Sequence, residues 1–220
     1  EDSALTTSPP IDTSSPADTS STSTTSPTNT APGGLHLPDW RGMDLVVLHV
    51  DALRADTLPG WGSPYDTLPL TRSRAWLRVH GDVASAPWTG PSTASALTGV
   101  SPHRHGVRHV TSGDEPREQI QVATFPPLYA AAGYATALVT GNAVLTGNTS
   151  FTDPFEAAYH HHKEAWVSNQ GEAVVTASEW IDGLDPGTPY LLWFQPMDVH
   201  APYCPDALDD GAFIASSEVP

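Results

Sequence analysis

Three short apolar runs restrict the folds open to this chain more than any other feature. They cover residues 44–51, 135–140 and 189–196, and each consists mainly of Val, Leu, Ala or aromatic side chains. Runs this short and continuous predict strands that are buried on both faces, which is typical of a parallel sheet. Residues 44–51, which lie between Gly42 and a polar turn, are interpreted as a central strand of that sheet.

Helical patterns alternate with these strands. The predicted helices are residues 91–98, 124–132 and 172–184. In the first of them, Pro91 suits the opening turn and Gly99 suits the C-terminal cap. Residues 81–86 are interpreted as a weak strand, and residues 75–80 as a helix end or short strand. The alternation predicts an α/β fold, a largely parallel sheet sandwiched by helices, in which ligands bind beyond the carboxyl ends of the strands.

The beginning of the chain differs in composition from the rest. Residues 3–34 are almost entirely Ser, Thr, Pro, Ala, Asp and Asn, and contain no aromatic side chain. Such a segment buries too little apolar surface to offset the entropy of ordering it. Residues 1–38 are therefore predicted to be a disordered Ser/Thr/Pro-rich spacer, either an extracellular stalk or a flexible linker. Residues 39–220 have the composition and length of a folded domain.

Charge and cysteine content exclude several classes of protein. The formal net charge of −16 argues against binding to nucleic acid or to an anionic membrane surface. The single cysteine, Cys204, excludes an intrachain disulfide. The chain begins at Glu1, which fits a mature form whose leader has been removed, or a trimmed chain. We expect an extracytoplasmic protein that is secreted, periplasmic or a cell-surface lipoprotein. A membrane tether through an N-terminal lipid outside this chain is left open.

Three polar residues follow predicted strands and are expected to meet at one edge of the sheet. The carboxylate of Asp51 can hold a hard or borderline cation. The hydroxyl of Thr89, just before a helix, can act as a nucleophile if a base or a metal lowers its pKa, and the helix N-terminus favours an anionic ester. His200 can donate to an ester oxygen or to the leaving group. Structural roles stay open for all three, as helix caps for Asp51 and Thr89 and as a loop side chain packed on Tyr203 for His200.

Five segments resemble, in order, the sulfatase branch of the alkaline phosphatase superfamily. They are residues 46–56 with Val-Asp-Ala-Leu-Arg, 85–99 with Trp-Thr-Gly-Pro-Ser-Thr, 102–107, 131–137, and 197–203 with His-Ala-Pro-Tyr. The resemblance covers residues 42–205 and implies that Asp51 binds metal and that Thr89 is the nucleophile. Members of that family are several hundred residues long and take further metal ligands from a later strand. Residues 39–220 are therefore expected to be the N-terminal part of a sulfatase-like hydrolase domain.

Four departures from the family pattern fall on its sulfate-recognition residues. Thr89 stands where sulfatases have the Cys or Ser that becomes formylglycine, and a secondary alcohol can give only a ketone, so formylglycine is not expected. Thr93 replaces an arginine, and Ala52 replaces the second aspartate of a pair. Asn142 lies in Gly-Asn-Ala-Val, where the family has Gly-Lys-Trp-His. Its amide can bind the ester oxygens of the substrate in place of the lysine, or it can cap the next element.

The resemblance implies a metal-dependent hydrolase of small anionic esters, either of phosphate or of sulfate. Thr89 and Asn142 favour phosphate mono- or diesters, because relatives with Thr at this position, such as nucleotide pyrophosphatase/phosphodiesterases, use the hydroxyl directly. The cofactor is expected to be a divalent metal ion, with Ca and Zn both left open. The alternative is a non-catalytic remnant that binds anions without turnover.

Other histidines are given structural roles. His103 and His105 flank an arginine in a segment that serves mostly as scaffold in the family. His160, His161 and His162 are adjacent, and neighbouring side chains diverge on any regular element, so we do not expect them to chelate one ion. They are interpreted as a solvated loop or the start of a helix.

Overall fold

The computed structural model of the chain describes its folded part. The described residues are 41–64, 79, 81–109, 117–163, 167–168, 170–197 and 199–200. The chain divides into two units, Glu1–Arg41 and Gly42–Pro220, and the description below concerns the second. The predicted spacer, the segment 75–78 and Cys204 lie outside the described residues.

Four parallel strands form the main sheet. Their order across the sheet is β1 (Leu45–Leu48), β6 (Tyr190–Gln195), β2 (Ala135–Thr140) and β3 (Ala157–His160). A separate antiparallel pair consists of β4 (His162–Lys163) and β5 (Val167–Ser168). The predicted α/β class and parallel sheet are confirmed.

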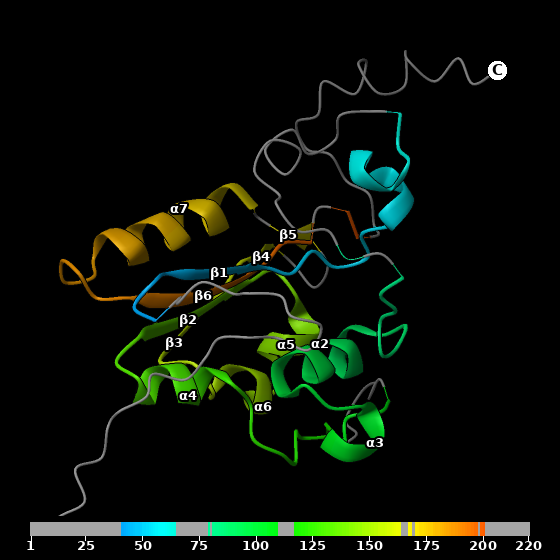
Figure 1. Cartoon of the computed structure of the whole chain (residues 1–220), viewed down its shortest axis with the longest axis horizontal. Helices are drawn as coiled ribbons and strands as arrows, with labels where there is room; N and C mark the ends of the chain where they lie inside the picture. Colours follow the sequence, from blue (N-terminus) through cyan, green and yellow to red (C-terminus); the bar gives the residue numbers. More distant parts are fainter. Residues whose placement is uncertain are drawn as a thin grey trace, which may run out of the picture. The chain divides into compact units, whose positions relative to one another are not determined.

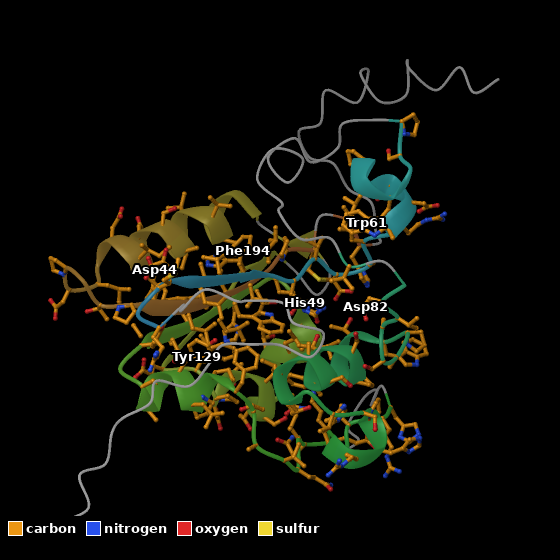
Figure 2. All side chains as sticks on the ribbon, viewed as in Figure 1. Asp44, His49, Trp61, Asp82, Tyr129 and Phe194 are labelled. Atoms are coloured by element: carbon orange, nitrogen blue, oxygen red, sulfur yellow. The ribbon has the colours of Figure 1, made fainter. Side chains whose placement is uncertain are left out.

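Helices cover both faces of the sheet (Figure 1). On one face lie α2 (Thr89–Thr98), α4 (Pro126–Ala131), α5 (Ala143–Thr146) and α6 (Thr149–Thr152), and on the other face lies α7 (Gln170–Asp182). The short helices α3 (Pro102–His105), η1 (Ala55–Thr57) and η2 (Pro59–Trp61) complete the elements. The core on the α2 face includes Leu97, Leu138 and Trp193, and the core on the α7 face includes Val139, Ala177 and Leu192. In Figure 2, Tyr129 lies on the α4 side of the sheet and Phe194 on the α7 side.

Helix α2 begins two residues earlier than its sequence pattern predicts. Trp88 is the N-cap, with extended backbone, and Thr89 is the first helical residue. The helix ends as predicted at Gly99, whose φ of 70° is left-handed and whose N–H donates to the carbonyl of Ser95. The chain therefore presents Thr89 on the first turn of a capped ten-residue helix rather than on a loop.

Three of the sequence predictions about secondary structure are wrong. Strand β1 lies at an edge of the described sheet, not at its centre, and Val46 and Leu48 are each 53% exposed because α7 packs on β2 and β3 instead. Residues 81–86 form no strand and are mostly exposed. His160 ends β3 and His162 begins β4, so the three adjacent histidines lie in strands and the residue that joins them.

We predict that Leu97→Ala will lower the free energy of unfolding by about 2–5 kcal/mol, because it removes a fully packed side chain between α2 and the sheet. Leu128→Ala is the matched control, since Leu128 is on helix α4 but is 68% exposed, and its effect should stay within about 0.5 kcal/mol. Urea unfolding of both variants measures the difference. Equal losses would contradict this assignment of the core.

Candidate active site

The centre of the candidate site is one oxygen atom of Asp51. Its Oδ2 accepts a hydrogen bond from the hydroxyl of Thr89 at 2.9 Å and another from the Nδ2 of Asn142 at 2.7 Å. These residues are 38 and 91 positions away from Asp51 in the sequence. The structure therefore brings together three residues that the sequence singled out, at the edge where the strands end.

The register of the sheet explains why these residues meet. His49 and Asp51 continue β1 beside β6, since their N–H groups donate to the carbonyls of Phe194 and Pro196. Alternate residues of a strand share a face, so the residues two places after the aligned positions 49, 195 and 140 form a row on the α2 side, called the site row below. That row consists of Asp51, Met197 and Asn142, and the Nδ2 of Asn142 also lies 3.2 Å from the sulfur of Met197. Sequence reasoning did not identify Met197, because a thioether beside a strand end carries no chemical signal of its own.

Asn142 fills the capping role that its sequence left open, and its role in binding ester oxygens stays a prediction. Its Oδ1 accepts the N–H of Val144 at 2.8 Å, which caps α5, while its Nδ2 donates to Asp51. Its backbone N–H is in turn held by the hydroxyl of Thr140. Because Asn142 is only 2% exposed and its amide is held at both ends, its donor group is fixed toward Asp51.

The hydroxyl of Thr89 is held in a polar setting. Since Thr89 begins α2, the unpaired N–H groups and the positive end of the helix dipole lie beside it. Thr93, one turn further along α2, is 1% exposed, and its hydroxyl has no hydrogen-bond partner among the described residues. Both positions that the family resemblance associates with sulfate-binding cations, 93 and 142, thus carry neutral, buried side chains here.

The turn after Asp51 is strained. Ala52 has a φ of 58°, and within the described ranges no other residue except glycine has a positive φ. A left-handed alanine costs roughly 1–2 kcal/mol. Strain of this kind is common at functional sites, where surrounding contacts hold it in place.

His200 lies just beyond the row that contains Asp51. Its backbone N–H donates to the carbonyl of Met197 at 2.9 Å, so His200 lies in a turn that begins at Met197. Met197 in turn contacts Asn142. Its placement at the carboxyl end of β6 agrees with the sequence prediction. Its catalytic role stays a prediction.

His105 holds helix α2 in place. Its ring is fully buried, its Nδ1 accepts the N–H of Val107, and its Nε2 donates to the hydroxyl of Ser95 on α2. Burial lowers the pKa of His105 below its usual value, and the carbonyl of Pro91 and the charge of Glu118 offset part of this effect. The imidazole is therefore kept neutral, as a structural brace.

The described residues supply only part of a metal site. Among them, no three His, Cys, Asp or Glu side chains cluster in a way that could hold an ion. The carboxylate of Asp51 and the hydroxyl of Thr89 are oxygen donors of the kind that hard divalent cations prefer. They fit such an ion as two of its ligands, and the remaining ligands would come from water, from substrate or from elsewhere in the protein.

Comparisons with known proteins agree with this fold. The family model described as Sulfatase matches residues 44–214. Among solved structures, the chain is similar to that of BT4656 in complex with its substrate, D-glucosamine-2-N,6-O-disulfate, with a TM-score of 0.63 and 20% sequence identity. The match covers 79% of this chain and 38% of that one, and at this identity it shows the fold alone. No curated protein matches the chain closely enough to count as a relative.

The parallel sheet with helices on both faces defines the class of the protein as an α/β fold. The match to the family model then identifies the family: the chain belongs to the sulfatase family. No helix among the described residues is long and apolar enough to span a membrane.

We predict that Asn142→Asp will be more damaging than Asn148→Asp at neutral pH. Both asparagines cap four-residue helices, but the Nδ2 of Asn142 donates to a carboxylate, whereas that of Asn148 donates to the carbonyl of Glu118. The new carboxylate at 142 will face Asp51, so Asn142→Asp should cost about 2 kcal/mol more at pH 7. The gap should shrink toward pH 4, where one carboxyl of the pair gains a proton and donates. Urea unfolding across this range is the measurement, and a gap that does not depend on pH would contradict the contact.

We predict a histidine-dependent loss of stability in mild acid. The pKa of His105 is lowered in the folded state, so the unfolded chain binds more protons at its usual pKa of about 6.5. The contribution of neutral His105 is complete above that pH and is lost as the pH falls below it. His105→Gln should be less stable than the wild type at pH 8, and this difference should narrow toward pH 5. His103→Gln, at an exposed neighbour, is the control and should leave the profile unchanged.

Proposed function

We propose that this protein is a hydrolase of anionic esters in which Thr89 is the nucleophile, and that phosphate mono- or diesters are preferred over sulfate esters. The observation that carries the proposal is the 2.9 Å hydrogen bond from the hydroxyl of Thr89 to Asp51. A hydroxyl that points its proton at a carboxylate directs its lone pairs elsewhere, so it is oriented for attack.

The chemistry of Thr89 favours direct attack over formylglycine chemistry. Oxidation of its secondary alcohol would give a ketone and not an aldehyde. Thr93 and Asn142 replace the cations expected at a sulfate site, and both are neutral. A phosphate monoester carries more negative charge than a sulfate ester, so a site that is centred on a metal ion stabilises it more.

In the proposed reaction, Oγ1 of Thr89 forms a bond to phosphorus while the bond to the leaving oxygen breaks. The hydroxyl proton moves along the existing hydrogen bond to Asp51, and His200 donates a proton to the leaving oxygen. Water then attacks the phosphothreonine, gives one proton back to His200 and releases phosphate, while Asp51 returns the proton to Thr89. Asn142 holds the carboxylate still throughout.

A divalent metal ion bound by Asp51 would lower the pKa of the attacking hydroxyl and neutralise charge on the ester. Ca and Zn both remain candidates, since the oxygen donors of Asp51 and Thr89 suit either ion. The metal dependence is part of the proposal.

The expected substrate preference is tested by hydrolysis of 4-nitrophenyl phosphate, its phosphodiester analogue and 4-nitrophenyl sulfate, each with added Ca²⁺ or Zn²⁺. Thr89→Ala should lower kcat at least about 1,000-fold, and Thr89→Ser should keep part of the activity because a primary hydroxyl can still attack. Acid quenching followed by mass spectrometry should find a phosphoryl group on Thr89.

Thr149→Ala is the matched control, because Thr149 is also the first residue of a helix but is exposed on α6. Its activity should equal that of the wild type. Sulfate turnover that dominates and survives Thr89→Ala would overturn both the substrate class and the nucleophile.

A second function is an anion-binding protein without turnover. It is favoured by the lack of a three-ligand metal cluster in the described part of the chain. Calorimetry with inorganic phosphate separates the two functions, since this alternative expects binding that depends on Asn142 while every ester stays intact.

A further inference from the structure

A second polar row lies directly beneath the candidate site. It consists of Thr140 and Gln195, which end β2 and β6, and of His49, which directly follows β1, all on the α2 side of the sheet. Each member stands two residues before a member of the site row, since Asp51, Met197 and Asn142 follow at that spacing. In Figure 2, His49 lies at one end of β1 and Asp44 lies at the other end. The hydroxyl of Thr140 accepts the backbone N–H of Asn142, so one member of this row already supports a residue of the site.

The hydrogen bonds of Gln195 fix the proton position on His49. The indole Nε1 of Trp193 lies 3.1 Å from one end of the Gln195 amide, and an indole N–H can only donate, so that end is the oxygen. The Nδ1 of His49 lies 3.1 Å from the same oxygen and must therefore donate as well. The neutral imidazole thus carries its proton on Nδ1. The ring is also held edge-on against Trp193, with centroids 5.0 Å apart.

The network is retained at a cost. With its oxygen directed at Trp193 and His49, Gln195 turns its Nε2 the other way, where it has no partner among the described residues although the side chain is 1% exposed. A buried donor without a partner destabilises the folded state. An apolar side chain at 195 would instead leave the N–H groups of Trp193 and His49 without their acceptor, so the oxygen of Gln195 serves these two donors.

We propose that His49 is a positioning residue of the site, acting through its Nδ1 bond to Gln195. Strand β1 is only four residues long and pairs on one side, with β6. Asp51 follows its end and precedes the strained Ala52, with one longer backbone bond of 3.4 Å to Pro196. The side-chain bond from His49 to Gln195 ties the end of β1 to β6 one row below Asp51. It keeps the carboxylate within reach of Thr89 and Asn142.

The position of Asp51 has a direct spectroscopic signature. The side-chain N–H of Asn142 that donates to the carboxylate gives a shifted amide resonance, identified by its absence in Asn142→Ala. His49→Leu removes the donor to Gln195 and should move this resonance toward that of a free amide. His49→Asn restores an N–H donor near the position of Nδ1 and should return it. Gln195→Met removes the same acceptor from His49, and that of Trp193 as well, so it should shift the resonance at least as far. Adding His49→Leu to Gln195→Met should then change little, since the bond between His49 and Gln195 is already lost.

The tautomer is tested on the wild-type protein at pH 9, where a free imidazole is neutral. Long-range proton–nitrogen correlation should show the proton of His49 on Nδ1. A proton on Nε2, or an Asn142 resonance that does not respond to His49→Leu, would overturn the proposal. His109→Leu is the control, because the Nδ1 of His109 contacts Glu118 in an exposed loop. It should leave the Asn142 signal in place.

The consequence for catalysis rests on the proposed function. If Thr89 attacks an ester, His49→Leu should lower kcat for 4-nitrophenyl phosphate about 10- to 100-fold with KM little changed, and His49→Asn should recover most of it. The resonance and tautomer measurements need no substrate, so the positioning role stands or falls on them even if no ester is cleaved. Spectra as expected with no turnover would count against the proposed function alone.

Discussion

The arrangement at the carboxyl edge of the sheet depends on the shared oxygen of Asp51. Thr89 and Asn142 both donate to it, from the first turn of α2 and from the loop after β2. The half-buried carboxylate of Asp51 is stabilised by both neutral donors, which replace part of the water that a free carboxylate would bind. The interaction therefore ties a strand, a helix and a helix cap to one geometry.

On the α2 side of the sheet, the side chains change from apolar to polar toward this oxygen. Apolar side chains such as Leu97 and Trp193 fill the core between α2 and the sheet. At or just after the strand ends, the side chains on this face become polar, with Thr140, Gln195 and His49 in one row. The site row follows two residues later. Because parallel strands in register end together, a few polar residues at the ends of unconnected segments are enough to build a polar site on an apolar base.

Much of this could be predicted from the sequence where the signal was local. The apolar runs gave the strands 135–140 and 189–196, and Pro91 with Gly99 gave α2 to within two residues. The edge position of β1 could not be predicted, because an apolar run does not tell which of its neighbours will cover it. Asn142 and Asp51 were each identified from the sequence, but their contact could not be predicted. The distance between the two loops depends on the order of the strands in the sheet. The pairing of His49 with Gln195 has no sequence signal, since it depends on register across two strands.

Asn142 illustrates how geometry limits evolutionary change. The position needs an acceptor for the N–H of Val144 and a donor for Asp51 on one short side chain. Aspartate keeps only the acceptor, serine is too short to span both, and glutamine adds a methylene in a buried space. A single residue that satisfies two partners of opposite polarity has few neutral replacements, so a different residue at this position requires a rearrangement of Asp51 or of the start of α5.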